Sequence, residues 1–222
     1  MMKYKFQWAA MLGLLLPVAL MPQISAGCSV ADFQRLQWLC SDYQMAVKGY
    51  VVEGWFRMVH MPGMERFLES KLQIESGIHQ IVLADGSVLS TSMIQKNNRW
   101  YIELQLISKH REQAVLYYSR WQQFADFYAP ETPVGVTAIS ELSEPIDVNT
   151  SGQLVRELAE GLGLQTVSEI ATEQYIQVSG YSHQLFHKIC VNGIELNGSI
   201  TAVPQGSCTY FYIASPVLYQ QI

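Results

Sequence analysis

The alternation of apolar and polar residues along the chain predicts a protein built from both helices and strands. In four segments the apolar residues return every three to four positions, which is the period of a helix with one buried face. These segments are residues 29–43, 62–76, 111–128 and 151–162. A shorter helix is expected over 182–190, where Ser182 would be the N-cap.

Strands are expected where apolar and polar residues alternate strictly, or where short apolar runs lie between turn residues. They are residues 47–59, 78–84, 87–95, 100–107, 134–139, 175–181, 195–203, 208–214 and 217–221. Asp85-Gly86 and Asn97-Asn98 are strong signals for tight hairpins, which favour antiparallel pairing. Mostly antiparallel strands with helices on one face make an α+β domain. The two parts of the domain, about 45–129 and 130–222, have a similar order of elements and are plausible as related halves.

The N-terminal segment has the three parts of an export signal. Lys3 and Lys5 give a positive flank without acids, residues 8–21 are almost entirely apolar, and small residues precede Cys28. The apolar run is shorter than the roughly 20 residues that span a bilayer as a helix. We therefore predict a signal peptide over 1–27 that is removed, which leaves residues 28–222 as a single extracytoplasmic domain. In the alternative processing, Cys28 is lipidated and anchors the protein to a membrane.

Charge argues against nucleic acid as a partner. The whole chain has a net charge of −5, and without Lys3 and Lys5 there are 12 basic residues against 19 acidic ones, a net of −7. Proteins that bind a phosphate backbone need a stripe of Lys and Arg, because counterion release supplies most of their affinity. The sequence has no run of basic residues that would form such a stripe.

The sequence contains no recognisable catalytic, metal or cofactor motif. Residues 180–184 resemble a nucleophile elbow around Ser182, but Gln184 stands where the motif needs its second glycine. His183 and His187 would share a face of the short helix, without the glutamate and third ligand of a zinc protease. The four cysteines, Cys28, Cys40, Cys190 and Cys208, would permit two disulfides in an oxidising compartment. We expect them instead to be free, buried thiols.

Three short motifs near the C-terminus resemble the YwmB-like family of exported proteins from spore-forming Gram-positive bacteria. They are residues 178–182 (VSGYS), 192–197 (NGIELN) and 209–217, which ends in Ala214-Ser215-Pro216-Val217. The chain departs from the family pattern at Ala214, where a glycine is usual, and in its final three residues. The resemblance implies two related halves like those of the TATA-box-binding protein, and an exported location. It implies no activity and no catalytic residues.

One face of the predicted sheet carries an unusual number of amphipathic rings next to neutral hydrogen-bonding groups. The predicted outward positions are Glu53, Trp55, Arg57, Tyr101, Glu103, Gln105, Tyr175, Gln177, Ser179, Tyr181, Asn197, Ser199, Thr201, Tyr210 and Tyr212. Tyr and Trp are common anchors of binding surfaces. The ligand-binding candidates among these positions are Trp55, Arg57, Tyr101, Tyr175, Tyr181, Tyr210 and Tyr212.

This face suggests a non-enzymatic protein that binds an envelope glycan, peptide or protein. The alternative is an envelope hydrolase in which Glu53, Glu103 and Arg57 form a dispersed site. A carboxyl group with a raised pKa in a deep pocket would favour the hydrolase, and a shallow, open face would favour the binding protein.

Overall fold

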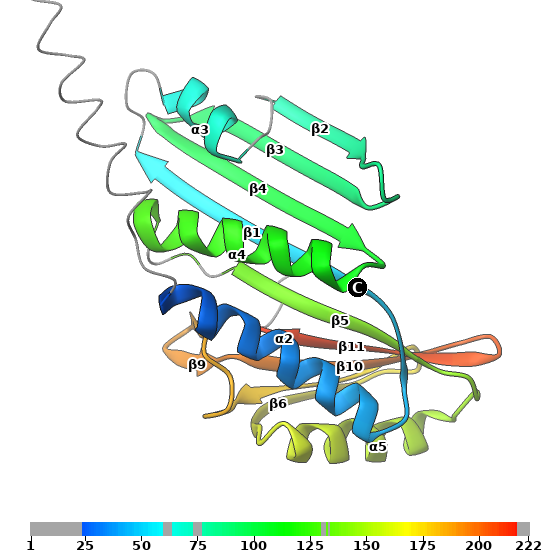
Figure 1. The fold of residues 1–222 in the computed structure, drawn as a ribbon. Coiled ribbons are helices and arrows are strands. Elements are labelled where there is room, and N and C mark those ends of the chain that lie inside the picture. Colours follow the sequence, from blue (N-terminus) through cyan, green and yellow to red (C-terminus); the bar gives the residue numbers. More distant parts are fainter. Residues whose placement is uncertain (1–23, 60–63, 73–76, 130–131, 133, 217–222) are drawn as a thin grey trace, which may run out of the picture.

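A computed structural model describes residues 24–59, 64–72, 77–129, 132 and 134–216 (Figure 1). Nine strands of this part form one antiparallel sheet in the order β2-β3-β4-β1-β5-β11-β10-β7-β6. They are β1 (Ala46–Val59), β2 (Gly77–Val82), β3 (Val88–Lys96), β4 (Arg99–Ser108), β5 (Val134–Leu142), β6 (Gln165–Ala171), β7 (Ile176–Tyr181), β10 (Gly198–Gln205) and β11 (Cys208–Ser215). Strands β8 (Ile189–Val191) and β9 (Ile194–Leu196) pair separately as a small hairpin.

The helices lie on one side of this sheet. They are α2 (Ile24–Asp42), α3 (Met64–Leu72), α4 (Arg111–Tyr128) and α5 (Val148–Gly161). Helix α4 packs on β1, β4 and β5, whereas α5 packs on β10, β7 and β6. The prediction of an α+β domain with a mostly antiparallel sheet packed against helices is therefore confirmed. Within the described residues, no helix has both the length and the apolar character needed to cross a membrane.

The strand order reads outward from a central pair, β1 and β5. Each of these strands is followed by a helix and then by a meander of strands whose last member returns to its side. The first meander is β2-β3-β4, with β4 next to β1, and the second is β6-β7-β10-β11, with β11 next to β5. The register joins the two parts along the antiparallel β1–β5 ladder, from Ala46 opposite Glu141 to Gly54 opposite Val134.

Helix α2 precedes β1 in the sequence but covers strands of the second part of the sheet. Helix α4, which follows the first meander in the sequence, covers β1 and β4. Helix α2 covers the corresponding strands β5 and β11 and also contacts α4 (Figure 1). The Phe33 ring of α2 lies 5.6 Å from the ring of Tyr50 and 5.2 Å from that of Tyr118. This helix is thus part of the core that both parts of the sheet share.

Hydrophobic periodicity predicted most of the first part correctly. Helix α4 has the predicted bounds, and along β1 Tyr50, Val52 and Phe56 are buried while Trp55 and Arg57 are exposed. Both predicted hairpin turns contain residues with positive φ, which this turn chemistry requires: Gly86 in one, and Asn97 and Asn98 in the other.

The predicted starts of two helices, α5 and α2, were wrong. Helix α5 begins at Val148 rather than 151, since the Asp147 carboxylate accepts hydrogen bonds from the backbone amides of Asn149 at 2.8 Å and Thr150 at 2.9 Å. Helix α2 begins at Ile24 rather than at the predicted residue 29. Helix α3 ends at Leu72, and the rest of the predicted segment to 76 lies outside the described residues.

In the second part, the predicted helix over 182–190 is wrong, because residues 182–188 form a loop and β8 starts at Ile189. The predicted strand 195–203 is interrupted at Asn197, which separates β9 from β10. Strand β6 was not predicted, since all seven of its residues are exposed at the sheet edge and show no alternation. Residues 1–23 and the predicted strand 217–221 lie outside the described part.

The cysteine prediction was partly wrong. Cys40, Cys190 and Cys208 are free thiols in the described part of the chain. Only Cys40 is fully buried, and burial raises the pKa of its thiol. Cys190 is exposed because it lies on the short β8–β9 hairpin rather than at the end of a packed helix.

Replacing Phe33 by Ala should lower the free energy of unfolding by about 3–5 kcal/mol, the usual cost of removing a buried aromatic side chain. The same change at Trp38, which is 48% exposed on the same helix, serves as the control and should cost far less. Urea denaturation of both variants measures the difference. Equal losses would mean that α2 does not belong to the core.

Candidate functional site

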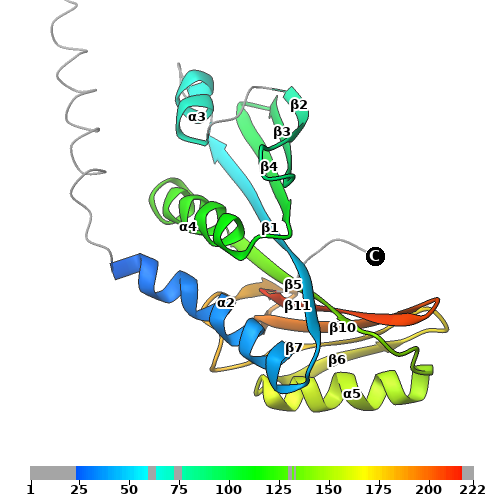
Figure 2. The same cartoon turned by 45° about the vertical axis from the view of Figure 1, so that its right-hand side comes forward.

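The face of the sheet that carries no described helix is concave. Figure 2 shows the first four strands rising at a steep angle from the remaining strands, with the helices outside this angle. Polar residues in the middle of the open face, such as Glu53, Thr137 and Thr201, are almost inaccessible. The strand alternation predicted the direction of Glu53 correctly, but alternation along one strand does not show whether an outward side chain is covered by other parts of the chain.

An exposed cluster lies on the open face at the C-terminal end of β1, on the neighbouring strands β1, β4 and β3. We call it the open-face patch. Its members are Trp55, Arg57, Val59, Ile94, Lys96, Arg99, Tyr101 and Glu103, and all of them are exposed. The register places Trp55 opposite Glu103 and Arg57 opposite Tyr101. Trp55 is 46% and Tyr101 40% exposed.

The patch combines rings with positive charge. The Arg57 guanidinium lies over the Tyr101 ring, 5.8 Å from its centroid. In the next row of the sheet, Arg99 pairs with Val59 on one side and with Lys96 on the other. Because these side chains stand on three hydrogen-bonded strands, their spacing is fixed by the sheet and not by loops.

The structure does not bring the other predicted binding residues to this patch. Tyr212 lies opposite Ile139 of β5, which in turn lies opposite Gly49 of β1. Gly49 and Trp55 are six positions apart on β1, which is about 20 Å at the rise of a strand. Tyr181 is separated from the patch across the sheet, on β7, four strands from β1 in the sheet order.

The remaining two tyrosines, Tyr175 and Tyr210, also belong to the second part of the sheet, next to β7 and in β11. Tyr175 precedes β7, and its backbone carbonyl accepts hydrogen bonds from the backbone amide and the hydroxyl of Thr172. Hydrogen bonding with Cys208 and Glu141 raises the pKa of Tyr210 to about 12. Of the seven predicted ligand-binding residues, only Trp55, Arg57 and Tyr101 therefore form one cluster.

Glu53 is the unusual carboxyl group of the open face. It is 4% exposed, and its Oε1 accepts a hydrogen bond of 2.6 Å from the amide of Gln105. Burial raises the pKa of Glu53, the hydrogen bond from Gln105 opposes this shift, and the charge of Glu103 adds to it. Glu53 therefore holds its proton more readily than an exposed glutamate.

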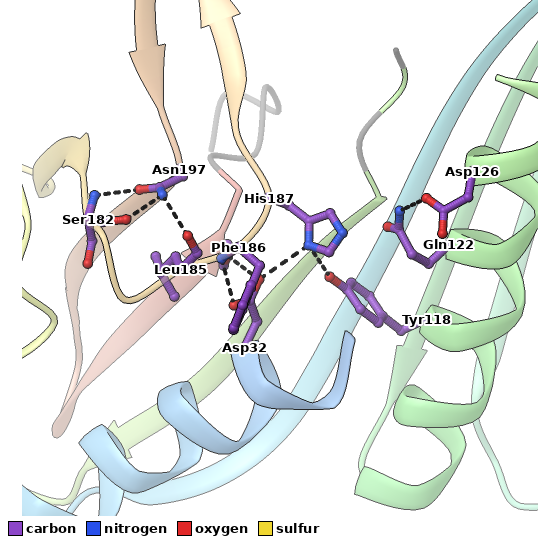
Figure 3. A network of polar contacts seen from close by, with 10 residues as sticks. Asp32, Tyr118, Gln122, Asp126, Ser182, Leu185, Phe186, His187 and Asn197 are labelled. Atoms are coloured by element: carbon purple, nitrogen blue, oxygen red, sulfur yellow. Dashed lines mark hydrogen bonds and ion pairs between the residues drawn. The ribbon is translucent and has the colours of Figure 1, made fainter. Parts of the chain in front are cut away.

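A second polar cluster connects α2, α4 and the loop of residues 182–188 (Figure 3). The fully buried carboxylate of Asp32 accepts hydrogen bonds from the Ser215 hydroxyl at 2.9 Å and from the backbone N–H of Phe186 at 3.2 Å. His187 Nδ1 lies 3.6 Å from the same carboxylate and 3.3 Å from the Tyr118 hydroxyl. Burial, followed by the charges of Asp32 and Asp126, raises the pKa of Tyr118 far above its usual range.

The loop that presents Phe186 and His187 is held by buried side chains rather than by regular structure. The Asn197 side chain accepts from the Ser182 amide at 2.6 Å and donates to the carbonyls of Ser182 and Leu185. The Ser182 hydroxyl donates to the carbonyl of Leu162 at 2.7 Å. Asn197 therefore points inward, contrary to its predicted place on the open face, and Ser182 ties a loop together instead of capping a helix.

The Asp32 cluster is not arranged for nucleophilic catalysis. In a serine triad the histidine lies between the serine and the carboxylate, whereas here the carboxylate lies between Ser215 and His187. His183 and His187 lie in a loop and share no helix face. Among the described residues, no group of three or more His, Cys, Asp or Glu side chains is placed to hold a metal ion. The geometry instead suits a fixed junction between the N-terminal helix and both parts of the sheet.

Sequence reasoning missed Asp32 and two of the three basic members of the patch, Lys96 and Arg99, although all of them leave a signal. Asp32 lies on the apolar stripe of its helix, four positions before Leu36, where a charge requires partners. Arg99 continues the outward alternation of β4 by one step beyond its predicted start at 100, and Lys96 does so beyond the predicted end of β3 at 95. In comparisons with known proteins, no family model and no curated protein matches this sequence.

Replacing Asp32 by Ala should lower the free energy of unfolding by about 3–5 kcal/mol, because it leaves the buried Ser215 hydroxyl and the backbone N–H of Phe186 without this acceptor. Asp42, at the exposed end of the same helix, is the matched control, and its change to Ala should cost no more than about 0.5 kcal/mol. Chemical denaturation followed by circular dichroism compares them. Similar losses would show that the Asp32 contacts contribute little.

Replacing Glu53 by Gln should raise the melting temperature at pH 7. Because the pKa of Glu53 is raised in the folded state, the wild type loses stability as pH rises from the unfolded pKa of about 4.3 through the folded pKa. Glutamine has no proton to lose and retains the contact with Gln105. The gain should therefore be largest above the folded pKa and should shrink toward pH 4. A gain that is the same at pH 4 and pH 7 would contradict the assignment.

Proposed function

We propose that this chain is an exported, non-enzymatic protein of the cell envelope that binds another envelope component through the open-face patch. The proposal includes removal of residues 1–27, with lipidation of Cys28 as the alternative that would hold the domain at a membrane. It also includes kinship with the YwmB-like family and two halves related to those of the TATA-box-binding protein.

The order of elements supports two related halves. In each part a long strand, a helix and a returning meander follow one another, and the long strands β1 and β5 pair at the centre. Export is supported by the leader-like composition of residues 1–27. The similarity to a nucleic-acid-binding fold carries no function with it, because a fold does not determine what its surface binds.

The observation that carries the binding function is the gathering of Trp55 and Arg57 of β1 with Tyr101 of the adjacent strand β4. Large rings on a rigid surface lose little conformational entropy on binding, and Trp, Tyr and Arg dominate the energetics of known interfaces. Exposed large side chains that are gathered in one place and contain both apolar and polar parts favour recognition over chance exposure.

The geometry gives less support to the alternative hydrolase. Glu53, Glu103 and Arg57 share the open face, and the pKa of Glu53 is raised. The Glu53 side chain is nevertheless almost inaccessible and is already bonded to Gln105. A general acid must come within hydrogen-bond reach of the atom that it protonates, and Glu53 does not present its carboxyl group to a ligand lying on the patch.

Replacing Trp55 or Tyr101 by Ala should weaken binding of the mature protein to isolated cell envelopes, measured by co-sedimentation, about tenfold or more. The melting temperature should change little, since both side chains are on the surface. Trp38→Ala is the matched control, because Trp38 has nearly the same exposed fraction as Trp55 but lies on α2, a helix that packs on the opposite side of the sheet.

If Trp38→Ala weakens binding as much as Trp55→Ala does, the helical side of the molecule is the binding surface. A large fall in melting temperature for Trp55→Ala would mean that this ring packs in the core. If neither patch variant affects binding or stability, the open-face patch has no role in recognition.

A further inference from the structure

The charge of the open-face patch is opposite to that of the protein. The patch has three cations, Arg57, Lys96 and Arg99, and one carboxylate, Glu103. The whole chain has 19 acidic and 14 basic residues. In the described part of the chain, the charges of several other exposed lysine and arginine side chains are offset by acidic partners: Lys48 by Glu141, Arg156 by Glu169 and Lys188 by Glu195. A local positive charge on an acidic protein is a surface complementary to an anionic partner.

The rings and the cations occupy successive rows of the sheet. One row contains Arg57 and Tyr101 as direct partners, with Ile94 beside them on β3. The next row contains Arg99 and Lys96, and Trp55 belongs to the row on the other side. Neighbouring strands are about 4.8 Å apart and alternate residues about 7 Å apart. A partner that lies across these rows contacts apolar ring surface and positive charge within the same short segment.

From this arrangement we infer that the partner of the open-face patch is an anionic glycan, a sugar polymer that carries carboxylate or phosphate groups. This inference rests on the proposed function and specifies its ligand class. The apolar faces of the sugar rings pack on Trp55 and Tyr101, while the anionic groups pair with Arg57, Arg99 and Lys96. Arg is well suited to this role, because its planar guanidinium makes two parallel hydrogen bonds with a carboxylate or phosphate.

The patch is small and is set apart from the second part of the sheet. It lies on the open face of β1, β4 and β3, beyond Gly54, where the β1–β5 ladder ends. A single polymer chain can lie across these three strands. Nucleic acid is disfavoured because three cations neutralise few phosphates, and the overall negative charge of the protein repels the rest of a dense polyanion.

The test measures binding of the mature protein to polygalacturonate by biolayer interferometry. Methyl-esterified polygalacturonate is the matched uncharged ligand. The variant Arg57→Gln/Lys96→Gln/Arg99→Gln removes the three charges, and Lys109→Gln, an exposed residue just beyond the opposite end of β4, is the control for loss of a cation elsewhere. Single-stranded DNA and vesicles of anionic phospholipid are the competing ligands.

We expect the wild type to bind polygalacturonate about tenfold or more tightly than its ester, with an affinity that falls as salt rises. The triple variant should lose this preference, and Lys109→Gln should retain it. Equal binding of acid and ester that still depends on Trp55 would overturn the anionic ligand but leave the proposed binding face intact. Tighter binding to DNA or vesicles than to polygalacturonate, lost in the triple variant, would replace the glycan with that ligand. No binding to any of these ligands would overturn the inference. If, in addition, the patch variants left envelope co-sedimentation unchanged, the proposed function would fail as well.

Discussion

The antiparallel ladder between β1 and β5 is the interaction on which the rest of the structure depends. It makes one sheet out of two meanders, each of which would otherwise leave the backbone groups of its first strand unpaired. The ladder also fixes which side of each strand faces the helices, because a shift of one residue would exchange the two faces. The core beneath α4 and the exposed cluster around Trp55 and Tyr101 are therefore consequences of the same register.

Helix α2 completes what this ladder leaves open. The first meander is followed by a helix that covers it, and over β5 and β11 that cover comes from the N-terminal end of the chain. A helix supplied from so far away in sequence needs specific contacts, and Asp32 provides them. Its carboxylate bonds to Ser215 at the end of β11 and to Phe186 in the preceding loop, and His187 extends the contact to Tyr118 of α4. A buried charge is costly without such partners, so this cluster specifies one position for the helix.

Local patterns in the sequence correctly predicted elements that bury one face against the core and expose the other. Strand β1 and helix α4 are of this kind, since their alternation follows directly from burial of one face. Strand β6 was missed because it buries neither face at the sheet edge. The loop around Ser182 was mistaken for a helix because its fixed shape comes from Asn197, fifteen residues later in the chain. Contacts between distant residues leave no period in the local sequence.

For the candidate site too, the sequence predicted the direction of individual side chains but not which of them lie close together. The outward direction of Trp55, Arg57 and Tyr101 follows from alternation, and their proximity follows from the β1–β4 register, which local patterning does not give. The separation of Tyr181 and Tyr212 from them depends on the order of all nine strands. The inaccessibility of Glu53 is a property of the tertiary structure that alternation along β1 does not show. Because the ladder hydrogen bonds already hold the patch in place, a partner meets rings and cations that need little reordering. Most of the contact free energy then remains available for affinity.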